Sequence, residues 1–311
     1  MVAMAKPLQG GLPPVGAVTG PVVEIACDES GFSGTNLLDP VTPVITHASV
    51  DLGVGEAVAL IDELRSRFGY SPDELKSGRF LRGPYAGEAL DRFVAALDGR
   101  AHVHLVDKEF FLVTRLVDLF LAEPSYGAGT SLTGDQRAAA HTLHRAGRAA
   151  GPAWDAFLVA FVEMVRTKHR RRPDRRSFEL FFQARDALAE TAPAWEDELD
   201  RAHVWHVLNR LYDDPSVPPP LEPLLPALAE TVLFWSAGQR RVLVFHDEQS
   251  ALTAGRLRRL QQALADDTGV SPLAGLVSVD SRDDPRVQVA DLLAGVARRL
   301  PRTVGSLSDQ R

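Results

Sequence analysis

The sequence predicts an α/β fold in which a helical block interrupts a sheet-forming domain. Short β-branched runs lie near both ends of the chain, and between them apolar residues recur at three- and four-residue steps, the spacing of amphipathic helices. Strands alternating with helices around such a block are typical of one α/β domain with an insert. We therefore expect a disordered leader over residues 1–20, an α/β domain over 21–109 and 239–311, and a helical insert over 110–238.

The front of the chain predicts three strands and two helices. Val22–Cys27 is an apolar, β-branched run that ends abruptly in Asp28, as a core strand ends in a turn. Pro43 suggests that the next β-rich run starts a strand or lies at a sheet edge. In chain order the expected elements after the first strand are a strand over 41–50, a helix over 56–68, a turn-rich link over 70–78, a helix over 88–97 and a strand over 101–106.

The middle and the back of the chain follow the same two patterns. Six helices are expected in the insert, over 110–121, 135–150, 153–167, 178–190, 195–212 and 224–237. The run Pro218–Pro223 interrupts this block as a semi-rigid connector. Behind the insert we expect a strand over 241–246, a helix over 254–266, a strand over 273–279 and a final helix over 288–300.

Composition excludes several classes of protein. The chain has 311 residues, 45% of them hydrophobic and 24% charged, which is enough for a sizeable core. It has no apolar run of about 18 or more residues, so we expect no membrane span. Cys27 is the single cysteine, which excludes an intramolecular disulfide and a CxxC metal knuckle and fits a reducing cytoplasm. The net charge of -7 argues against nucleic-acid binding over the whole surface but allows a local basic patch.

Carboxylates stand where the chain leaves a strand or enters a helix. Asp28 follows the first strand, Glu74 lies in the turn-rich link, Asp247 follows the fourth strand, and Asp291 lies in the apolar final helix. Strand ends at one edge of an open sheet form a crevice, so these acids can converge there. Like charges in one site raise one another's pKa unless a cation neutralises them, and hard oxygen ligands favour Mg²⁺ or Mn²⁺. Two such ions about 3.5–4 Å apart can activate a water and stabilise the leaving oxygen of a phosphodiester.

Each of these acids also has a structural explanation. Asp28 could form a strand-end turn, Glu74 could lie in the first turn of a helix, and Asp247 could open the next helix. Asp291 is harder to explain in this way, because an Asp in an apolar stretch needs a buried partner of its own.

Four motifs together resemble a known family. They are Asp-Glu-Ser-Gly at 28–31, Glu-Leu-Lys at 74–76, His-Asp-Glu at 246–248, and Val-Gln-Val-Ala-Asp-Leu-Leu-Ala-Gly at 287–295. This pattern spans nearly the whole chain and resembles the bacterial domain-of-unknown-function family number 3800. The resemblance implies a ribonuclease H-like fold, a mixed sheet flanked by helices, here with an inserted helical subdomain. Members of that family are suspected metal-dependent nucleases, some of them linked to defence against foreign nucleic acid.

The resemblance also implies a site and an activity. Asp28, Asp247 and Asp291 would hold Mg²⁺ or Mn²⁺, with Glu74 as a fourth ligand. The implied function is a metal-dependent phosphodiester hydrolase acting on nucleic acid, with DNA and RNA equally open. The alternatives are a non-catalytic module that binds a nucleotide or a protein on the same fold, and a hydrolase of a small phosphorylated metabolite.

Basic residues and one histidine complete the prediction. Lys76, close to Glu74, could hold a scissile phosphate as a point charge, and His246 could act as a general acid or base near pH 7. The run Arg166–Arg176 is either a solvated helix end and loop or a phosphate-contacting patch, and no aromatic residue is interleaved in it for base stacking. The helical insert could clamp the substrate, dock a protein partner or self-associate.

Overall fold

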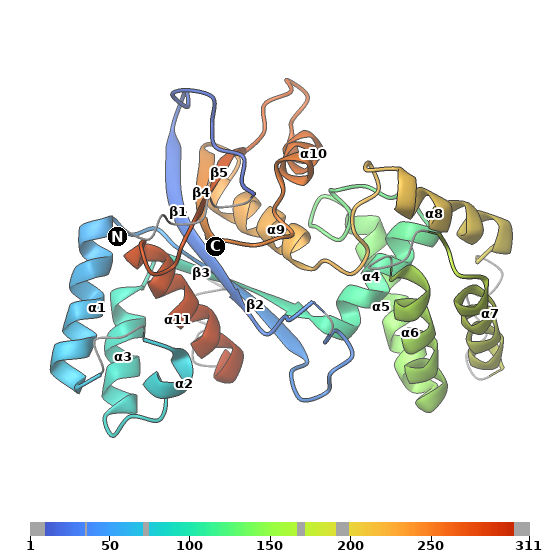
Figure 1. The fold of residues 1–311 in the computed structure, drawn as a ribbon, viewed down its shortest axis with the longest axis horizontal. Coiled ribbons are helices and arrows are strands. Elements are labelled where there is room, and N and C mark those ends of the chain that lie inside the picture. The colour runs from blue at the N-terminus through green and yellow to red at the C-terminus, as the bar shows by residue number, and fades with distance from the viewer. Residues whose placement is uncertain (1–9, 35, 71–74, 167–171, 191–198, 302–311) are drawn as a thin grey trace, which may run out of the picture. The chain divides into compact units, whose positions relative to one another are not determined.

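A computed structural model of the chain describes residues 10–34, 36–70, 75–166, 172–190 and 199–301 (Figure 1). The described part contains a five-stranded sheet in the order β3-β2-β1-β4-β5. The strands are β1 (Val22–Ser30), β2 (Val44–Val50), β3 (Ala101–Asp107), β4 (Arg241–Asp247) and β5 (Leu273–Val279). Because β1 pairs antiparallel with β2 and parallel with β4, which in turn pairs parallel with β5, the sheet is mixed. The expected α/β class, with a mixed sheet flanked by helices, is confirmed.

The chain divides into two compact units. The sheet unit comprises residues 1–32, 44–105 and 227–311, and the helical unit comprises 33–43 and 106–226. The helices that belong to the sheet unit are α1 (Val54–Phe68), α2 (Ser77–Phe80), α3 (Ala86–Ala96), α10 (Ala254–Leu264) and α11 (Pro285–Arg299). The helical unit contains α4 (Lys108–Phe120), α5 (Gly134–Ala149), α6 (Pro152–Val165), α7 (Arg175–Ala189) and α8 (Arg201–Asp213). Helix α9 (Leu224–Ser236) begins in the helical unit and continues into the sheet unit.

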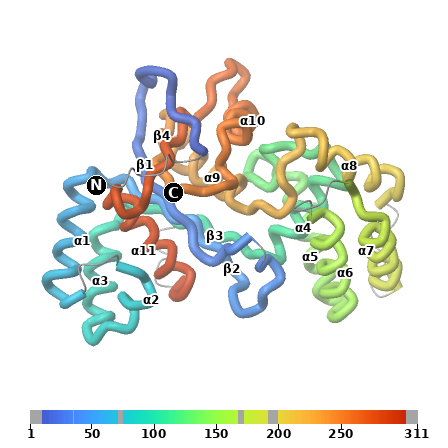
Figure 2. Tube along the Cα trace, in the orientation of Figure 1, coloured from blue at the N-terminus to red at the C-terminus, as the bar shows by residue number. Residues whose placement is uncertain are grey.

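Two layers of helices cover the sheet, one on each face (Figures 1 and 2). Side chains alternate across a strand, so Ala48 and Val50 of β2 join one apolar core with α1, α3 and α11. Ser49, between them, points to the opposite face, where the indole N–H of Trp235 in α9 donates to its hydroxyl at 2.8 Å. Helix α11 is buried along most of its length because its residues are apolar on almost every side.

The sequence predicts a disordered leader over residues 1–20, and the structure differs from this prediction at Leu12. Its backbone pairs with Leu276 at the edge strand β5, with N–H to carbonyl distances of 2.7 and 2.9 Å. An edge strand carries unpaired backbone groups, and this segment satisfies some of them. Helix α2 is also absent from the predicted elements, because its four residues are too few to show a helical period.

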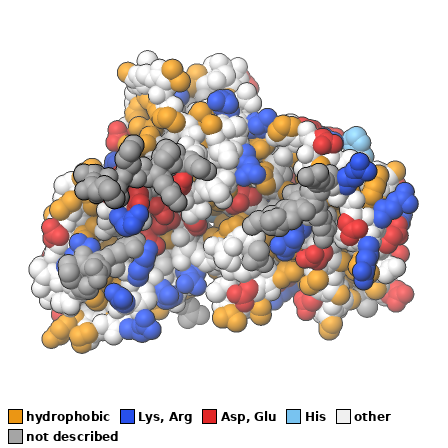
Figure 3. Space-filling view, in the orientation of Figure 1, with side chains coloured by type: hydrophobic (Ala, Val, Ile, Leu, Met, Phe, Trp, Pro, Cys, Tyr) orange, Lys and Arg blue, Asp and Glu red, His pale blue; other side chains and the backbone are white. Residues whose placement is uncertain are grey.

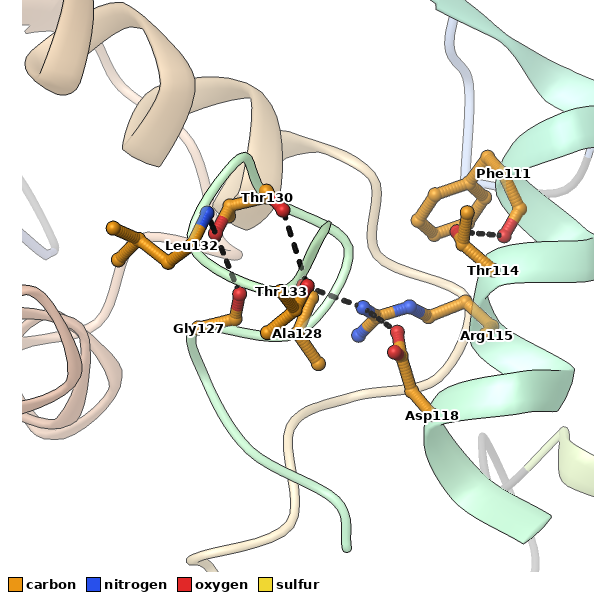
Figure 4. Close-up of polar contacts among 9 residues, drawn as sticks. All are labelled: Phe111, Thr114, Arg115, Asp118, Gly127, Ala128, Thr130, Leu132 and Thr133. Carbon is orange, nitrogen blue, oxygen red and sulfur yellow. Dashed lines mark hydrogen bonds and ion pairs between the residues drawn. The ribbon is translucent and has the colours of Figure 1, made fainter. Parts of the chain in front are cut away.

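The helical unit has an aromatic core and, between α4 residues, a buried ion pair. Phe120, Phe157 and Phe161 all pack around Phe181, with ring centroids 5.1–6.4 Å apart. On α4 the Arg115 guanidinium contacts the carboxylate of Asp118 (Figure 4). Arg115 also donates to the carbonyl of Ala128 at 2.7 Å, which ties the turn after α4 to this helix.

Candidate functional site

The carboxyl ends of β1 and β4 meet at one edge of the sheet. The two strands are parallel and in register up to the pair Cys27–His246, so Asp28 and Asp247 follow as neighbours. Ligands of open α/β sheets bind at such an edge. This edge is where the sequence predicts that the separated acids converge.

Asp28 is the most buried acid of the cluster. Its residue is 6% exposed, on the face of β1 that α11 covers, and its Oδ1 accepts the backbone N–H of Glu29 at 2.8 Å. Burial raises the pKa of Asp28 well above its ordinary value, and the carboxylates of Glu29, Asp291 and Asp247 raise it further. The three predicted acids Asp28, Asp247 and Asp291 are thus close enough to repel one another.

Asp247 lies between the end of β4 and the loop that follows β5. Its Oδ1 accepts the backbone N–H of Ser281 at 3.0 Å. Burial raises the pKa of Asp247, backbone hydrogen bonds from Ser281 and Glu248 lower it, and the charges of Asp280 and Asp291 raise it again; the net shift is upward. Asp280 directly follows β5, so the rule that located Asp28 and Asp247, an acid directly after a strand, would also have found it.

The start of α11 fixes the position of Asp291. Asp284 caps the helix by accepting the backbone N–H of Arg286 at 2.9 Å, and its other oxygen pairs with the guanidinium of Arg286 at 2.6 Å. That guanidinium lies 4.0 Å from the ring centroid of Phe245 in β4. The capped first turn is therefore attached to the strand that carries Asp247, and Asp291 follows less than two turns later.

Lys76 provides the cation of the cluster. Its Nζ donates to Oδ2 of Asp291 at 3.0 Å, and the lysine side chain is 55% exposed whereas the aspartate side chain is 20% exposed. An ion pair this exposed contributes little to stability. Its interest lies in the charge that it places beside the acids.

Gly295 explains why Lys76 can reach Asp291. A Cβ at Gly295 would lie 2.6 Å from Cβ of Ser77 and closer still to its hydroxyl, so a larger residue could not accept α2 at this distance. Gly295 stands one turn after Asp291 on α11, and Arg299, one turn further on, donates to the Ser77 hydroxyl. The same face of α11 thus presents the acid, the close approach and the anchor of α2. The motif that contains Gly295 was singled out from the sequence, but the contact was not.

The structure does not bring His246 into the cluster, which corrects the expected role as a general acid or base near pH 7. Alternation along β4 turns its side chain to the face opposite Asp247, where it is fully buried. Its Nε2 lies 3.2 Å from Nε2 of His47, whose Nδ1 lies 2.8 Å from the hydroxyl of Thr231. Burial lowers the pKa of His246 to about 4, so the ring is neutral at pH 7.

The neutral histidine pair has one consistent set of protons. Nδ1 of His246 lies 2.9 Å from the backbone carbonyl of Asp247 and must donate to it, because a carbonyl only accepts. Nε2 of His246 then accepts from His47, and Nδ1 of His47 accepts from the Thr231 hydroxyl. This chain of hydrogen bonds stabilises the buried layer beneath α9 and orients the end of β4.

The donor chemistry of the cluster fits a divalent cation, but its present arrangement is not that of a formed metal site. Asp28, Asp247 and Asp291 offer the hard carboxylate oxygens that Mg²⁺ and Mn²⁺ prefer. Across the described ranges, however, no three His, Cys, Asp or Glu side chains are placed together to hold a metal ion. Glu74, the predicted fourth ligand, lies outside the described residues. The Lys76 ammonium partly neutralises the cluster at Asp291.

Fold and site together define an α/β protein with an acidic cluster at the carboxyl edge of a mixed sheet. No family model, curated protein or solved structure matches the chain, so the resemblance to family 3800 stays a prediction. None of the helices in the described ranges is long and apolar enough to cross a membrane.

Proposed function

We propose that the protein is a divalent-metal-dependent phosphodiester hydrolase that acts on nucleic acid, with the ribonuclease H-like fold that its resemblance to family 3800 implies. One observation carries the proposal. Acids from β1, β4 and α11, which are far apart in the sequence, meet at a single sheet edge, where the carboxylates of Asp247 and Asp291 raise the pKa of Asp28 and that of Asp291 raises the pKa of Asp247. A cluster of this kind is costly without a cation and is ordinary around one.

The residues that would hold the ions are Asp28, Asp247 and Asp291, with Glu74 proposed as a further ligand. A divalent ion bound there supplies Lewis-acid polarisation of a phosphoryl oxygen and a water of lowered pKa. The protein's own contribution is to hold three carboxylates close together on rigid elements, at a place where a bound cation would favour their ionised forms. Burial of Asp28 on β1 and the backbone hydrogen bond from Ser281 to Asp247 fix two of them.

Lys76 has a defined place in this proposal. An ammonium is a compact, mobile point charge on a flexible stem, suited to a phosphate oxygen. Its contact with Asp291 in this structure keeps it beside the acids, where a substrate phosphate would offer it a further anionic partner. We place this activity in the cytoplasm, as the single buried cysteine predicts.

The experiment is cleavage of single- and double-stranded DNA and RNA by the purified chain with Mn²⁺. Asp28→Asn, Asp247→Asn and Asp291→Asn should each abolish cleavage and leave the circular dichroism spectrum unchanged. Asp62→Asn is the matched control, because Asp62 is an exposed acid on α1 outside the cluster. Full cleavage by the Asp28 and Asp291 variants would refute the site.

A second function is favoured by the contact of Lys76 with Asp291, which places an ammonium on a carboxylate oxygen that a metal ion would otherwise use. A module that binds a nucleotide without cleaving it needs only the Lys76 charge at the sheet edge. No acid-dependent binding of Mn²⁺ in calorimetry, together with no cleavage of any nucleic acid, would shift the assignment to such a module. Acid-dependent Mn²⁺ binding without cleavage of nucleic acid would shift it to a hydrolase of a small phosphorylated metabolite.

A further inference from the structure

A pocket of about 330 Å³ lies between α7 and α8 of the helical unit. This volume is within the usual range of small-ligand sites, roughly 300–1,000 Å³. Its lining consists of Arg175, Phe178, Glu179, Arg201, Ala202 and Trp205. The pocket lining thus combines two aromatic rings with two arginines, whereas the cluster in the sheet unit consists mainly of acids.

Trp205 gives the pocket an accessible aromatic surface. Phe178 is buried and meets the Trp205 ring edge to face, with centroids 5.1 Å apart and planes at 80°. Trp154 and Trp235 are each 2% exposed, whereas Trp205 is only partly buried. Phe178 therefore holds the Trp205 indole in one orientation while part of its surface is open to a ligand.

The two arginines differ in how firmly they are held. The Arg201 guanidinium lies 4.4 Å from the ring centroid of Phe182 and pairs with Glu179 at 2.6 Å. The Arg175 guanidinium lies 6.0 Å from the centroid of Trp205, at the outer limit of a cation–π contact. Arg175 is exposed and forms no ion pair with any described residue, so its charge is available at the rim of the pocket.

Each of the two arginines is the first residue of its helix and directly follows an aspartate that caps it. The carboxylates of Asp174 and Asp200 accept backbone N–H groups at 3.1 and 2.7 Å and keep their negative charge beside the arginines. The pocket therefore offers a phosphate the exposed guanidinium of Arg175 as a local donor, not a net positive field.

We propose that this pocket binds single-stranded nucleic acid, with a base stacked on Trp205 and the adjoining phosphates held by Arg175 and Arg201. An unpaired base needs a flat aromatic surface, and its backbone needs cations at the rim. A free phosphate would make no use of the indole. In Figure 3, Lys and Arg side chains lie over α7 and α8, at the right of the view, with acidic side chains among them.

The proposal also changes the interpretation of the run Arg166–Arg176. Its sequence has no interleaved aromatic residue, which favoured a solvated face. At Arg175, one of the described residues of this run, the fold supplies an aromatic ring from α8, about 30 residues further along the chain. The choice of nucleic acid as ligand rests on the proposed function, whereas the pocket, its ring and its charges do not.

The test measures binding without cleavage. A 5′-fluorescein-labelled 12-nucleotide oligo-dT or oligo-U is titrated with the full chain carrying Asp28→Asn, in EDTA, and followed by fluorescence anisotropy. Trp205→Leu should weaken binding roughly 5- to 150-fold, the worth of one stacked base. Trp205→Phe keeps a ring and should bind more tightly than the Leu variant. Arg175→Gln should reduce the slope of log K against log salt by about 1.

Arg258→Gln is the matched control, because Arg258 is an exposed arginine on α10 in the sheet unit. Binding by Arg175→Gln with the affinity and the salt slope of this control would overturn the proposal, even if the Leu variant fails to fold. Tighter binding of a duplex than of the single strand would overturn it as well.

Failure of the proposed function is distinguishable from failure of this inference. Trp205-dependent binding by a chain that never cleaves would support the pocket and refute the nuclease. Cleavage by wild type together with unaltered binding by the pocket variants would support the nuclease and refute the pocket.

Discussion

Gly295→Ala should destabilise the protein, although alanine is the better helix former. The substitution removes the flexibility of glycine in α11, which by itself favours folding by about 1 kcal/mol. The new Cβ would lie 2.6 Å from Cβ of Ser77, and relieving an overpacked contact of this kind costs about 1–3 kcal/mol. The net effect is a loss of up to about 2 kcal/mol. Displacement of α2 should also separate Lys76 from Asp291.

Gly87→Ala is the control for this prediction. Gly87 lies in α3, and a Cβ there would meet no atom within 4 Å, so the variant should gain about 0.4–1 kcal/mol. Urea unfolding of both variants measures the difference, which isolates the contact with Ser77. Adding Ser77→Gly to Gly295→Ala removes the obstructing side chain and should recover part of the loss.

A result in which both alanine variants are stabilised equally would refute the reasoning. It would mean that α2 can move from α11 without cost, and that the approach of Lys76 to Asp291 is not fixed by packing. Cleavage assays on the same variants then show whether the position of Lys76 matters for activity.

Three further predictions concern buried charge. Arg115→Leu should lower the free energy of unfolding in urea by roughly 3–5 kcal/mol, because it leaves Asp118 buried without its cation. The double variant with Asp118→Leu should recover much of this free energy. A double variant as unstable as the single one would contradict the account. In EDTA, Asp28→Asn should be more stable than wild type at pH 7. The raised pKa of Asp28 means that the native state takes up a proton at a higher pH than the unfolded chain does. Wild type therefore gains stability as pH falls through the native pKa, and the advantage of the variant disappears near pH 4. A stability advantage independent of pH would exclude a charge effect. Mn²⁺ at about 100 times its dissociation constant should stabilise wild type by about 2.7 kcal/mol. It should stabilise Asp62→Asn equally and have no effect on the stability of Asp291→Asn. An equal effect on all three proteins would place the ion elsewhere.

The acids at the sheet edge were predictable because each leaves a local mark. Asp28 and Asp247 follow apolar runs of strand length, and Asp291 interrupts an apolar helix. Parallel strands bring their carboxyl ends to the same edge, so convergence follows from topology without knowledge of any single contact. The helices were predictable for a similar reason, since a buried face imposes its period on the sequence.

Features that depend on contacts between distant segments were not predictable. His246 stands beside Asp247 in sequence, yet strand alternation turns it toward His47 on the opposite face of the sheet. The sequence does not distinguish Gly295 from any other small residue of the helix, because its close contact with Ser77 is visible only in the structure. The sequence around Trp205 does not indicate that Arg175 lies over its ring. In each case the partner is set by packing between elements, which no local period encodes.

The energetics of Asp28 argue that the acidic edge serves a ligand and not the fold. Its carboxyl is buried beside three other carboxylates, and the hydrogen bond from the backbone N–H of Glu29 only partly offsets the free-energy cost of a charge there. An uncharged side chain of similar size would fold more favourably in the same place, because it would remove the repulsion and keep the volume. Local violations of this kind concentrate at functional sites, where a ligand supplies the missing compensation. Here the compensation has to be positive, and Lys76, which pairs with Asp291, supplies one charge where several acids meet.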